Sequence, residues 1–415
     1  MININGAIIY ADEIDDMVYN QIEEITKHPV FKNSKIRIMP DCHAGKGCVI
    51  GFTSVNYGRE VIPNVVGVDI GCGVRTVIFN TEGKINFRSL DDFIRKNIPS
   101  GINSRTSPHK NICKKLIDKI DYVSELIGET EKKDCFINSL GTLGGGNHFI
   151  EIGKISEKRY MLSVHTGSRN FGLKICRCFQ KMGNTIDIKE KNKLISMHKT
   201  AKNPEEHSTI NEAINNLPII SSDLAYITDE NFEKYMDCMD IAKEYASYNR
   251  TFITDDIMDY LSENYNINIE EKFDTIHNYI DWYNPEHTKT IIRKGAVSAE
   301  KNQRLSIPLN MKDGIIVGTG RGNTEWNCSA PHGAGRRLSR SEARKNISLE
   351  EFKNAMKGVE TWSVSENTID ESPQSYKNSK NIISYIKENV DIDFIAKTIY
   401  NFKCGNDFLN AFWYM

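Results

Sequence analysis

The chain has 415 residues, of which 39% are hydrophobic and 26% are charged, and its formal net charge at pH 7 is −2. This is ordinary globular composition, with enough length for one large domain or two of average size. The near-neutral charge excludes a protein that coats nucleic acid with a generally basic surface, so any site for a polyanion must be local.

Signals for export and for membrane insertion are missing from the sequence. The first residues lack a basic segment followed by an apolar stretch, and no window approaches the roughly 18 apolar residues of a membrane span. The ten cysteines are scattered and do not form the framework of a small disulfide-rich domain. We therefore expect a cytoplasmic protein with reduced thiols and no membrane contact.

Short runs rich in β-branched residues predict strands, each beside a Gly, His or Asp cluster. Residues 180–225 are rich in Lys, Asn and Glu, and we expect them to form a peripheral helix and loop segment. No repeat or Pro/Ser-rich linker marks a boundary, so residues 1–415 are predicted to be a single domain. The predicted strands lie at residues 35–40, 75–80, 160–165, 289–297 and 313–318.

Two helices are well marked in the sequence. The first runs from about 229 to 247 after an N-cap at Thr228, and its apolar residues form one stripe that we assign to core packing. The second begins at Ser348, where Glu351 completes a capping box and Gly358 sits near the expected end. A hydrophobic staple supports this second helix. The stripe consists of Phe232, Met236, Met239, Ala242 and Ala246, and the staple of Ile347 and Phe352.

Residue types that bind metals concentrate in glycine-flanked segments. Asp69 and Cys72 can converge from one tight turn around Gly71, and they offer a hard oxygen and a soft thiolate that can bridge two ions. Three histidines each end or follow a predicted strand, where a rigid scaffold can aim imidazoles at one point. One such histidine alone is more often a core or surface residue than a ligand. Several ligand-type residues in glycine-flanked turns favour a metal site of catalytic type, and spacing alone predicts no more than that. The histidines are His148, His165 and His277, and the segments are 39–47, 66–73, 143–152, 163–172 and 275–280.

A sixth segment, residues 318–340, places His332 among small residues and arginines. His332 could be another ligand or a nucleophile, because an imidazole nitrogen attacks phosphorus well. Arg336 and Arg340 would then neutralise phosphates. Taken alone, the local basic cluster is better explained as a solvated helix face than as a phosphate site. The cluster consists of Arg336, Arg337, Arg340, Arg344 and Lys345.

The ordered set DCHAGKG, VGVDIGCG, LGTLGGGNHF with IEI, HTGSRNFG, HNY, RKGAVSA and HGAGRRLSR, over about residues 39–377, resembles the RtcB family of RNA ligases. The resemblance implies an α+β fold. It would be a single RtcB-like domain in which mixed and antiparallel sheets surround a buried metal site and helices lie at the periphery.

The resemblance also implies roles for individual residues. His332 would be the nucleophile that becomes guanylylated, and Asp41, in a motif with His43, would lie close to the metals and take part in ligation. Two Mn²⁺ ions would be bridged by Cys72. The implied metal ligands are Asp69, Cys72, His148, His165 and His277. The implied guanylate pocket consists of Asn147, Phe149, Glu151, Ala334, Gly335, Arg336 and Tyr376.

The implied activity is that of a GTP- and Mn²⁺-dependent 3′-phosphate/5′-hydroxy nucleic acid ligase. It would join RNA 3′-phosphate or 2′,3′-cyclic phosphate ends to 5′-hydroxyl ends through a covalent histidine–GMP, in tRNA splicing or RNA repair. Its partners would be broken tRNA or rRNA, and the need for an activating protein stays open. We expect the protein to be a monomer. RNA phosphates would be contacted by Arg75, Arg169, Arg250 and the basic cluster at 336–345.

Two departures from the family pattern touch nucleotide recognition and spare the metal and His332 motifs. Residues 308–312 read Pro-Leu-Asn-Met-Lys where the family reads Pro-Gly-Ser-Met-Gly. The family ends in Val-Lys-Gly, but this chain ends in FKCGNDFLNAFWYM, with Lys403 as a candidate substitute for the lysine. The choice of GTP over another nucleotide therefore stays open.

Two other functions fit the same ligands. A metal-dependent phosphohydrolase or nuclease would use them to activate water, and a non-catalytic RNA-end-binding relative would keep them without nucleotide turnover. Both would leave His332 without a chemical role. The intact HGAGR motif around His332 favours the ligase.

Overall fold

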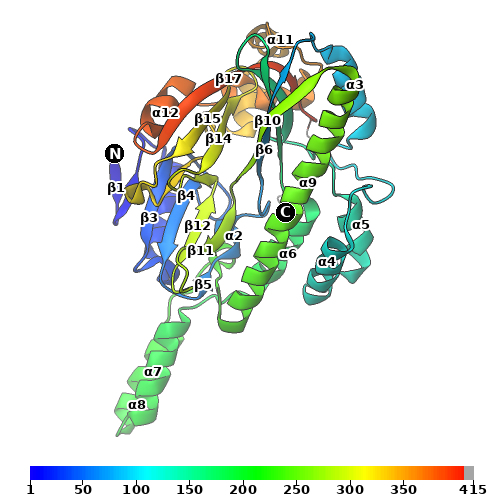
Figure 1. Cartoon of the computed structure of the whole chain (residues 1–415). Coiled ribbons are helices and arrows are strands. Elements are labelled where there is room, and N and C mark those ends of the chain that lie inside the picture. Colours follow the sequence, from blue (N-terminus) through cyan, green and yellow to red (C-terminus); the bar gives the residue numbers. More distant parts are fainter. Residues whose placement is uncertain (406–415) are drawn as a thin grey trace.

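Two large sheets form the body of the protein in the computed structural model, which describes residues 1–405 (Figure 1). The first has six strands and contains one parallel pair, β2 with β3, among antiparallel ones. Its strand order is β1 (Ile2–Ile4), β2 (Ala7–Ile9), β3 (Lys35–His43), β4 (Ile50–Asn56), β12 (Thr290–Lys294) and β11 (Tyr279–Trp282).

The second sheet has seven strands, and all of its pairs are antiparallel. Mixed and antiparallel sheets together with helices confirm the expected α+β class. The strand order is β10 (Ile267–Ile276), β6 (Gly73–Thr81), β8 (Arg159–Thr166), β7 (Phe149–Lys154), β17 (Val390–Phe402), β15 (Gly314–Gly320) and β14 (Arg304–Asn310).

Two small sheets complete the strand structure. One pairs β13 (Ala296–Ser298) with β16 (Ser329–Pro331), and the other pairs β5 (Glu60–Val61) with β9 (Ile227–Thr228). All five predicted strands are present, but the run at 289–297 is divided between β12 and β13. The division falls at Gly295, whose φ is +59°. A β-carbon there would lie 2.1 Å from Ile50 Cγ2, so only glycine fits this turn.

The longest helix, α9 (Asp229–Asn264), packs against both β6 and β8 of the seven-stranded sheet. It begins after Thr228, and every residue of the predicted apolar stripe is buried. The helix continues well beyond residue 247, where the prediction ended. Asn249, Arg250 and Thr254 are fully buried polar residues that interrupt the apolar pattern in this second half.

The helix predicted at Ser348 is α11 (Leu349–Ala355), and the Ser348–Glu351 capping box is present. It ends at Ala355, before Gly358. The remaining α-helices surround the sheets (Figure 1). They are α1 (Asp16–Lys27), α2 (Pro63–Val66), α3 (Phe87–Asn97), α4 (Lys114–Leu126), α5 (Lys133–Asn138), α6 (Arg169–Lys181), α7 (Ile188–Thr200), α8 (Pro204–Asn215), α10 (Arg340–Asn346) and α12 (Ser379–Ile386).

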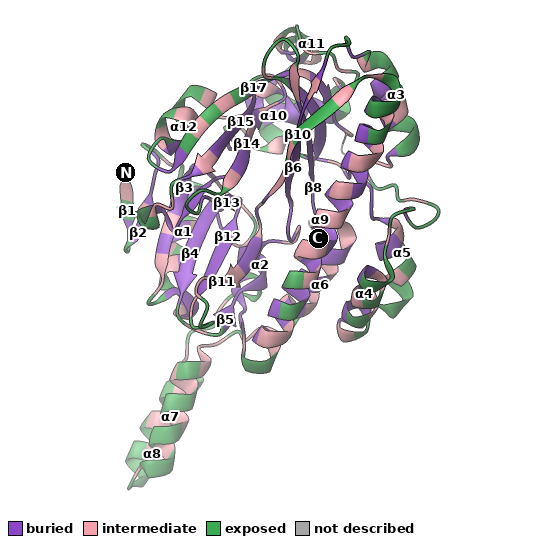
Figure 2. Cartoon of the chain, in the orientation of Figure 1, coloured by how far each residue is buried: buried purple, intermediate pink, exposed green. Residues whose placement is uncertain are grey.

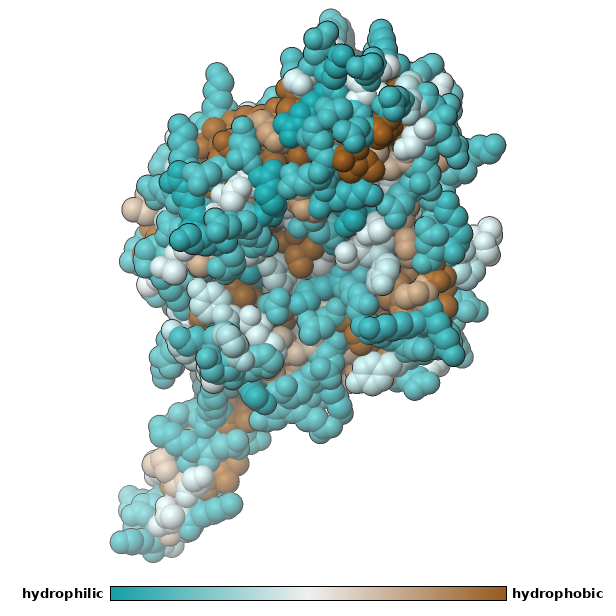
Figure 3. All heavy atoms as spheres, viewed as in Figure 1, coloured by the Kyte–Doolittle hydropathy of each residue, from teal (hydrophilic) through white to brown (hydrophobic). Residues whose placement is uncertain are grey.

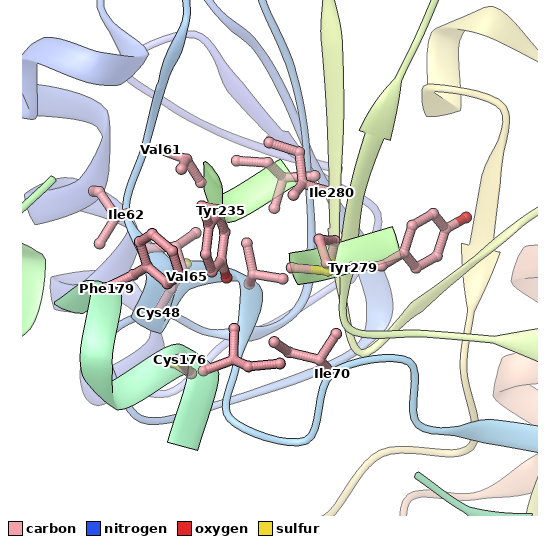
Figure 4. Close-up of a cluster of buried hydrophobic side chains, with 14 of the residues drawn as sticks. Cys48, Val61, Ile62, Val65, Ile70, Cys176, Phe179, Tyr235, Tyr279 and Ile280 are labelled. Carbon is pink, nitrogen blue, oxygen red and sulfur yellow. The ribbon is translucent and has the colours of Figure 1, made fainter. Parts of the chain in front are cut away.

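The largest hydrophobic cluster joins the six-stranded sheet to α2, α6 and α9. Figure 4 shows part of it, where Val65 of α2, Phe179 of α6 and Tyr235 of α9 lie together. Most of the face drawn in Figure 3 is hydrophilic. None of the helices within residues 1–405 is long and apolar enough to cross a membrane. All ten cysteines are free thiols.

Helices α7 and α8 form a hairpin that projects from the body (Figures 1 and 2). No residue of either helix is buried. The two ends of the hairpin are held together by backbone hydrogen bonds between Asn184 and Tyr226, at 2.7 and 3.2 Å. This hairpin occupies most of the segment 180–225, which was expected to be peripheral.

We expect the hairpin to be dispensable for folding. Replacing residues 190–216 by a short Gly/Ser linker should change the free energy of unfolding by less than about 1 kcal/mol, because the replaced residues bury no side chain. Urea unfolding of the two proteins measures this difference. A loss of several kcal/mol would show that the hairpin packs on the body or on another molecule.

Candidate active site

A cavity of about 1210 Å³ is lined by strand residues of both large sheets, by the loops that join them and by the start of α1. Every candidate site residue lines it except Asp41 and His148, which contact lining residues from behind. The long-range fold therefore brings together side chains that are spread from residue 41 to residue 376 of the sequence. The cavity is the place where these residues can act together.

Two groups of potential metal ligands share one sulfur. Cys72 forms one group with His165 and His277, and a second group with Asp69 and His148. Within each group the ligand atoms lie within 4.8 Å of one another. Cys72 Sγ lies 3.3 Å from His165 Nε2 and 3.5 Å from His148 Nε2. A sulfur common to both groups is placed to bridge two ions.

The histidines are oriented by backbone carbonyls. Nδ1 of His148 donates to Leu143 O at 2.9 Å, and Nδ1 of His165 donates to Asn147 O at 3.1 Å. These bonds fix the tautomer and leave each Nε2 lone pair facing the cluster. The expectation that each histidine ends or follows a strand is wrong for His148, which precedes β7 and is held by its loop instead.

The chemistry of this donor set fits a divalent transition metal. Burial lowers the pKa of His165 and His277 well below the usual value, so both are neutral near pH 7. Burial and the Asp69 charge raise the pKa of the Cys72 thiol well above its usual value. A cation held at the site would supply the positive charge that a thiolate needs there.

Arg250 ties two of the ligand turns together. It is fully buried, and its Nη1 donates to Gly71 O at 2.7 Å and to Thr166 O at 2.9 Å. Asp274 balances its charge through an Oδ2 contact of 3.0 Å. The expected contact of Arg250 with RNA is wrong, because the guanidinium is enclosed by the protein. Sequence reasoning missed this role, which the interrupted apolar stripe could have suggested.

His332 follows β16 and is held by a carboxylate. Its Nδ1 donates to Oδ2 of Asp41 at 2.7 Å, and Asp41 is completely buried. This bond directs the Nε2 lone pair away from Asp41 and makes it the free nucleophilic nitrogen. The His332 and His277 rings lie 4.9 Å apart. Asp41 therefore contacts His332 and belongs to neither ligand group, in keeping with its expected place beside the metal ligands but not among them.

Another part of the cavity lining is a wall of charged and aromatic residues around Lys403. Lys403 Nζ lies 2.8 Å from Glu371 Oε2 and 5.5 Å from the centre of the Phe149 ring. Tyr376 donates its hydroxyl to the same Glu371 oxygen at 2.6 Å. Burial raises the pKa of Glu371, but the charges of Lys403, Arg340 and Arg336 more than offset this and lower it. Lys403 thus lies among the residues expected to form the guanylate pocket.

Three arginines of the basic cluster at 336–345 pair with two buried carboxylates. Arg336 lies 3.3 Å from Glu371, while Arg340 and Arg344 lie 3.3 and 3.2 Å from Asp370. These three arginines are therefore held by carboxylates, whereas Arg337 and Lys345 of the same cluster are exposed. Sequence reasoning missed both acids, whose only signal was their position shortly before Tyr376.

The altered loop 308–312 is part of the hairpin between β14 and β15. Pro308, Leu309, Asn310 and Met311 line the cavity. Asn310 Oδ1 accepts from the backbone N–H groups of Lys312 and Asp313, each at 2.9 Å, and so closes the turn. Side chains thus line the cavity where the family pattern has glycine and serine.

Glu151 is a buried carboxyl whose partners are neutral. Its two oxygens accept from the Thr398 hydroxyl and the Asn401 amide, each at 2.9 Å. Burial raises its pKa to about 7, although these hydrogen bonds and the Lys403 charge oppose the shift. A carboxyl with such a pKa is half protonated near neutral pH.

The sequence is similar to those of known proteins over about nine tenths of its length. The family model described as tRNA-splicing ligase RtcB matches residues 21–131 and 118–403. The RNA-splicing ligase RtcB of Escherichia coli (strain K12) is 31% identical over 406 residues, which cover 91% of this chain and 92% of that protein. The tRNA-splicing ligase RtcB of Methanococcus maripaludis is 27% identical over 461 residues, covering 90% and 89% of the two chains.

We expect Glu151→Gln to remove a pH dependence of stability. The pKa of Glu151 rises from 4.5 to about 7 on folding. Ionisation of this carboxyl therefore does not affect stability below pH 4.5 and lowers the free energy of unfolding progressively as pH rises from 4.5 to 7. The variant should therefore gain about 3 kcal/mol relative to the wild type at pH 8. Urea unfolding at pH 4.5 and pH 8 measures this. An equal difference at both pH values would contradict the raised pKa.

Proposed function

We propose, because the chain belongs to the RtcB family, that it is an RNA ligase joining 3′-phosphate or 2′,3′-cyclic phosphate ends to 5′-hydroxyl ends. It uses GTP and two Mn²⁺ ions and passes through a covalent His332–GMP. The observation that carries this proposal is the His332–Asp41 pair facing a two-group metal cluster within one cavity. Its substrates are broken tRNA or rRNA, in splicing or repair.

The metal ligands are Asp69, Cys72, His148, His165 and His277. When bound, two divalent ions there stabilise negative charge on phosphate groups during their transfer. The choice of Mn²⁺ rests on the family resemblance, since Asp, Cys and His ligands also suit Zn²⁺. Arg250 keeps Cys72 and His165 in register by holding the carbonyls of their turns.

His332 carries the covalent chemistry. Its Nε2 attacks the α-phosphorus of GTP, a nitrogen–phosphorus bond forms, and pyrophosphate leaves. Asp41 keeps the proton on Nδ1 and stabilises the positive imidazolium that forms on attack. The RNA 3′-phosphate then takes the GMP from His332, and the 5′-hydroxyl displaces GMP from the activated end. A cyclic phosphate is first opened by hydrolysis.

The wall around Lys403 supports the guanylate assignment. Asn147, Phe149 and Glu151 face it from one side, and Arg336 and Tyr376 lie beside Glu371. Lys403 takes the place of the lysine near the end of the family pattern, because its ammonium lies beside Phe149. The guanidinium of Arg336 and the ammonium of Lys403 make the wall attractive to nucleotide phosphates.

The first test is covalent labelling with α-³²P-GTP and Mn²⁺, with α-³²P-ATP in parallel. We expect acid-labile label from GTP on the denatured wild-type protein and none on His332→Ala, because only His332 offers the nucleophilic nitrogen. His109→Ala serves as the matched control, since His109 is another buried histidine paired with a carboxylate, Asp256, outside the cavity. Label from ATP alone would overturn the choice of GTP. The absence of label from both nucleotides would overturn nucleotidyl transfer and favour hydrolysis or RNA-end binding.

A second test uses the shared sulfur. Cys72→Ala should lose both ions because Cys72 belongs to both ligand groups, whereas His277→Ala should keep about one. Metal analysis after dialysis against Mn²⁺ gives the stoichiometry, and Cys176→Ala, which removes another buried thiol, is the control. If Cys72→Ala and His277→Ala retain equal amounts of metal, the bridging role is wrong.

A further inference from the structure

Asp41 lies in a bulge of β3. Ile38 of β3 pairs with Phe52 of β4. The next paired residue of β3 is His43, five positions further on, whereas its partner Ile50 is only two positions from Phe52. The extra residues leave the regular ladder, and bulges next to functional sites re-aim a side chain in this way. Residues 39–42 are all buried, so their backbone oxygens need partners other than the neighbouring strand.

The side chain of Lys377 supplies two of these partners. Its ammonium donates to the backbone oxygens of Pro40 at 3.2 Å and Cys42 at 2.6 Å, the residues on either side of Asp41. The backbone oxygen of Asp41 itself accepts from His43 Nδ1 at 3.0 Å. One ammonium thus fixes the peptide segment on both sides of the carboxylate.

The backbone of Lys377 holds the loop that carries the nucleophile. Its N–H donates to the backbone oxygen of Gly335 at 2.9 Å, three positions after His332. Gly335 has a φ of +72°, and a β-carbon there would lie 2.1 Å from Asp41 O, so this loop packs directly against the bulge. Lys377 therefore contacts both segments whose side chains meet in the 2.7 Å bond between Asp41 and His332.

Lys377 acts through its neighbours, because it does not reach the cavity. Gly335 and Tyr376 line the cavity, whereas Lys377 does not belong to its lining within residues 1–405. Its contacts therefore bear on the placement of Asp41 and His332 and not on a bound ligand. Placement matters for rate, since a shift of about 1 Å in a reacting group costs roughly 100-fold.

We propose that Lys377 is a positioning residue for the nucleophile. It fixes the Asp41 bulge against the Gly335 loop, so that Nδ1 of His332 stays on the carboxylate and Nε2 stays aimed at the phosphorus it attacks. This inference rests on the proposed function, in which His332 is the nucleophile. It gives a role to the lysine that ends the segment ESPQSYK at 371–377, of which only the tyrosine was expected to have one.

The first measurement is the single-turnover rate constant of His332 labelling at saturating α-³²P-GTP with Mn²⁺. Lys377→Met removes both bonds of the ammonium and should lower this rate constant about 10- to 100-fold, because the nucleophile is misplaced. The GTP concentration that gives half the maximal rate should change less than about 3-fold, since Lys377 does not touch the nucleotide. Lys377→Arg should recover most of the rate constant, because a guanidinium can also donate to two carbonyls.

Lys35→Met is the matched control. The Lys35 ammonium also joins distant segments through a backbone oxygen, that of Thr324 at 2.8 Å, and it belongs to the start of the same strand, β3. Within the described part of the chain Lys35 is not among the residues that line the cavity, so this variant should label at the wild-type rate. A purely structural role for Lys377 would lower the free energy of unfolding in urea and leave the rate constant of the folded protein unchanged.

The second measurement needs no nucleotide. The Nδ1 proton of His332, which donates to Asp41, should give a downfield ¹H NMR signal that His332→Ala identifies by its loss. We expect this signal to be lost or shifted upfield in Lys377→Met and to be kept in Lys377→Arg and Lys35→Met. Wild-type protein that shows the signal but takes no label from either nucleotide would overturn the ligase proposal. The positioning contact would then be judged by the NMR signal alone.

Three outcomes would overturn the inference. They are a wild-type rate constant in Lys377→Met, an effect confined to the half-maximal GTP concentration, and an unchanged His332 signal in that variant. If Lys377→Met does not fold, Lys377→Gln replaces it, because its amide can still donate to one of the two carbonyls. That variant should label about 10-fold more slowly than the wild type, as for the loss of one charge-assisted hydrogen bond. An unchanged rate constant in Lys377→Gln would then reject the role of Lys377.

Discussion

The buried guanidinium of Arg250 is the constraint on which the arrangement of the candidate metal ligands depends. Its position is fixed because it donates hydrogen bonds to the carbonyls of Gly71 and Thr166 and forms an ion pair with Asp274. Gly71 lies in the turn that carries Cys72 before β6, and Thr166 follows His165 at the end of the neighbouring strand β8. Truncation of Arg250 would leave two buried carbonyls and a carboxylate without their donor. Strands β6 and β8 thus carry the ligands, and Arg250 of α9 holds their backbone in place.

Charge is distributed unequally along the cavity. At one end, buried acids and cations are matched: Glu371 is shared by Arg336 and Lys403, and Asp370 by Arg340 and Arg344. In the middle, Asp41 is matched with His332. Lys294 also lines the cavity, and its ammonium donates to the backbone carbonyls of Lys46 and Asn64. The matched groups hold the cavity lining in place without any bound ligand.

Local sequence patterns predicted the parts of the fold that depend on local rules. The five strands, the apolar stripe of α9 and the Ser348 capping box need only near neighbours, and all are present. Motif spacing and family resemblance nominated residues that the fold does gather around one cavity. The roles of Arg250, Asp370 and Glu371 were not predicted, since each depends on partners far away in sequence. The contact between Asp41 and His332 spans 291 positions, and no local pattern encodes it.

The hairpin of α7 and α8 adds length to the chain but contributes no residue to the lining of the cavity. Its ends meet at the Asn184–Tyr226 bridge, so the body already closes upon itself without the helices. A fluorescent domain, an affinity handle or a surface tether placed between α7 and α8 would point away from the body (Figure 1). The protein could thus be anchored or observed one molecule at a time through this arm while the cavity stays open to a long polymer.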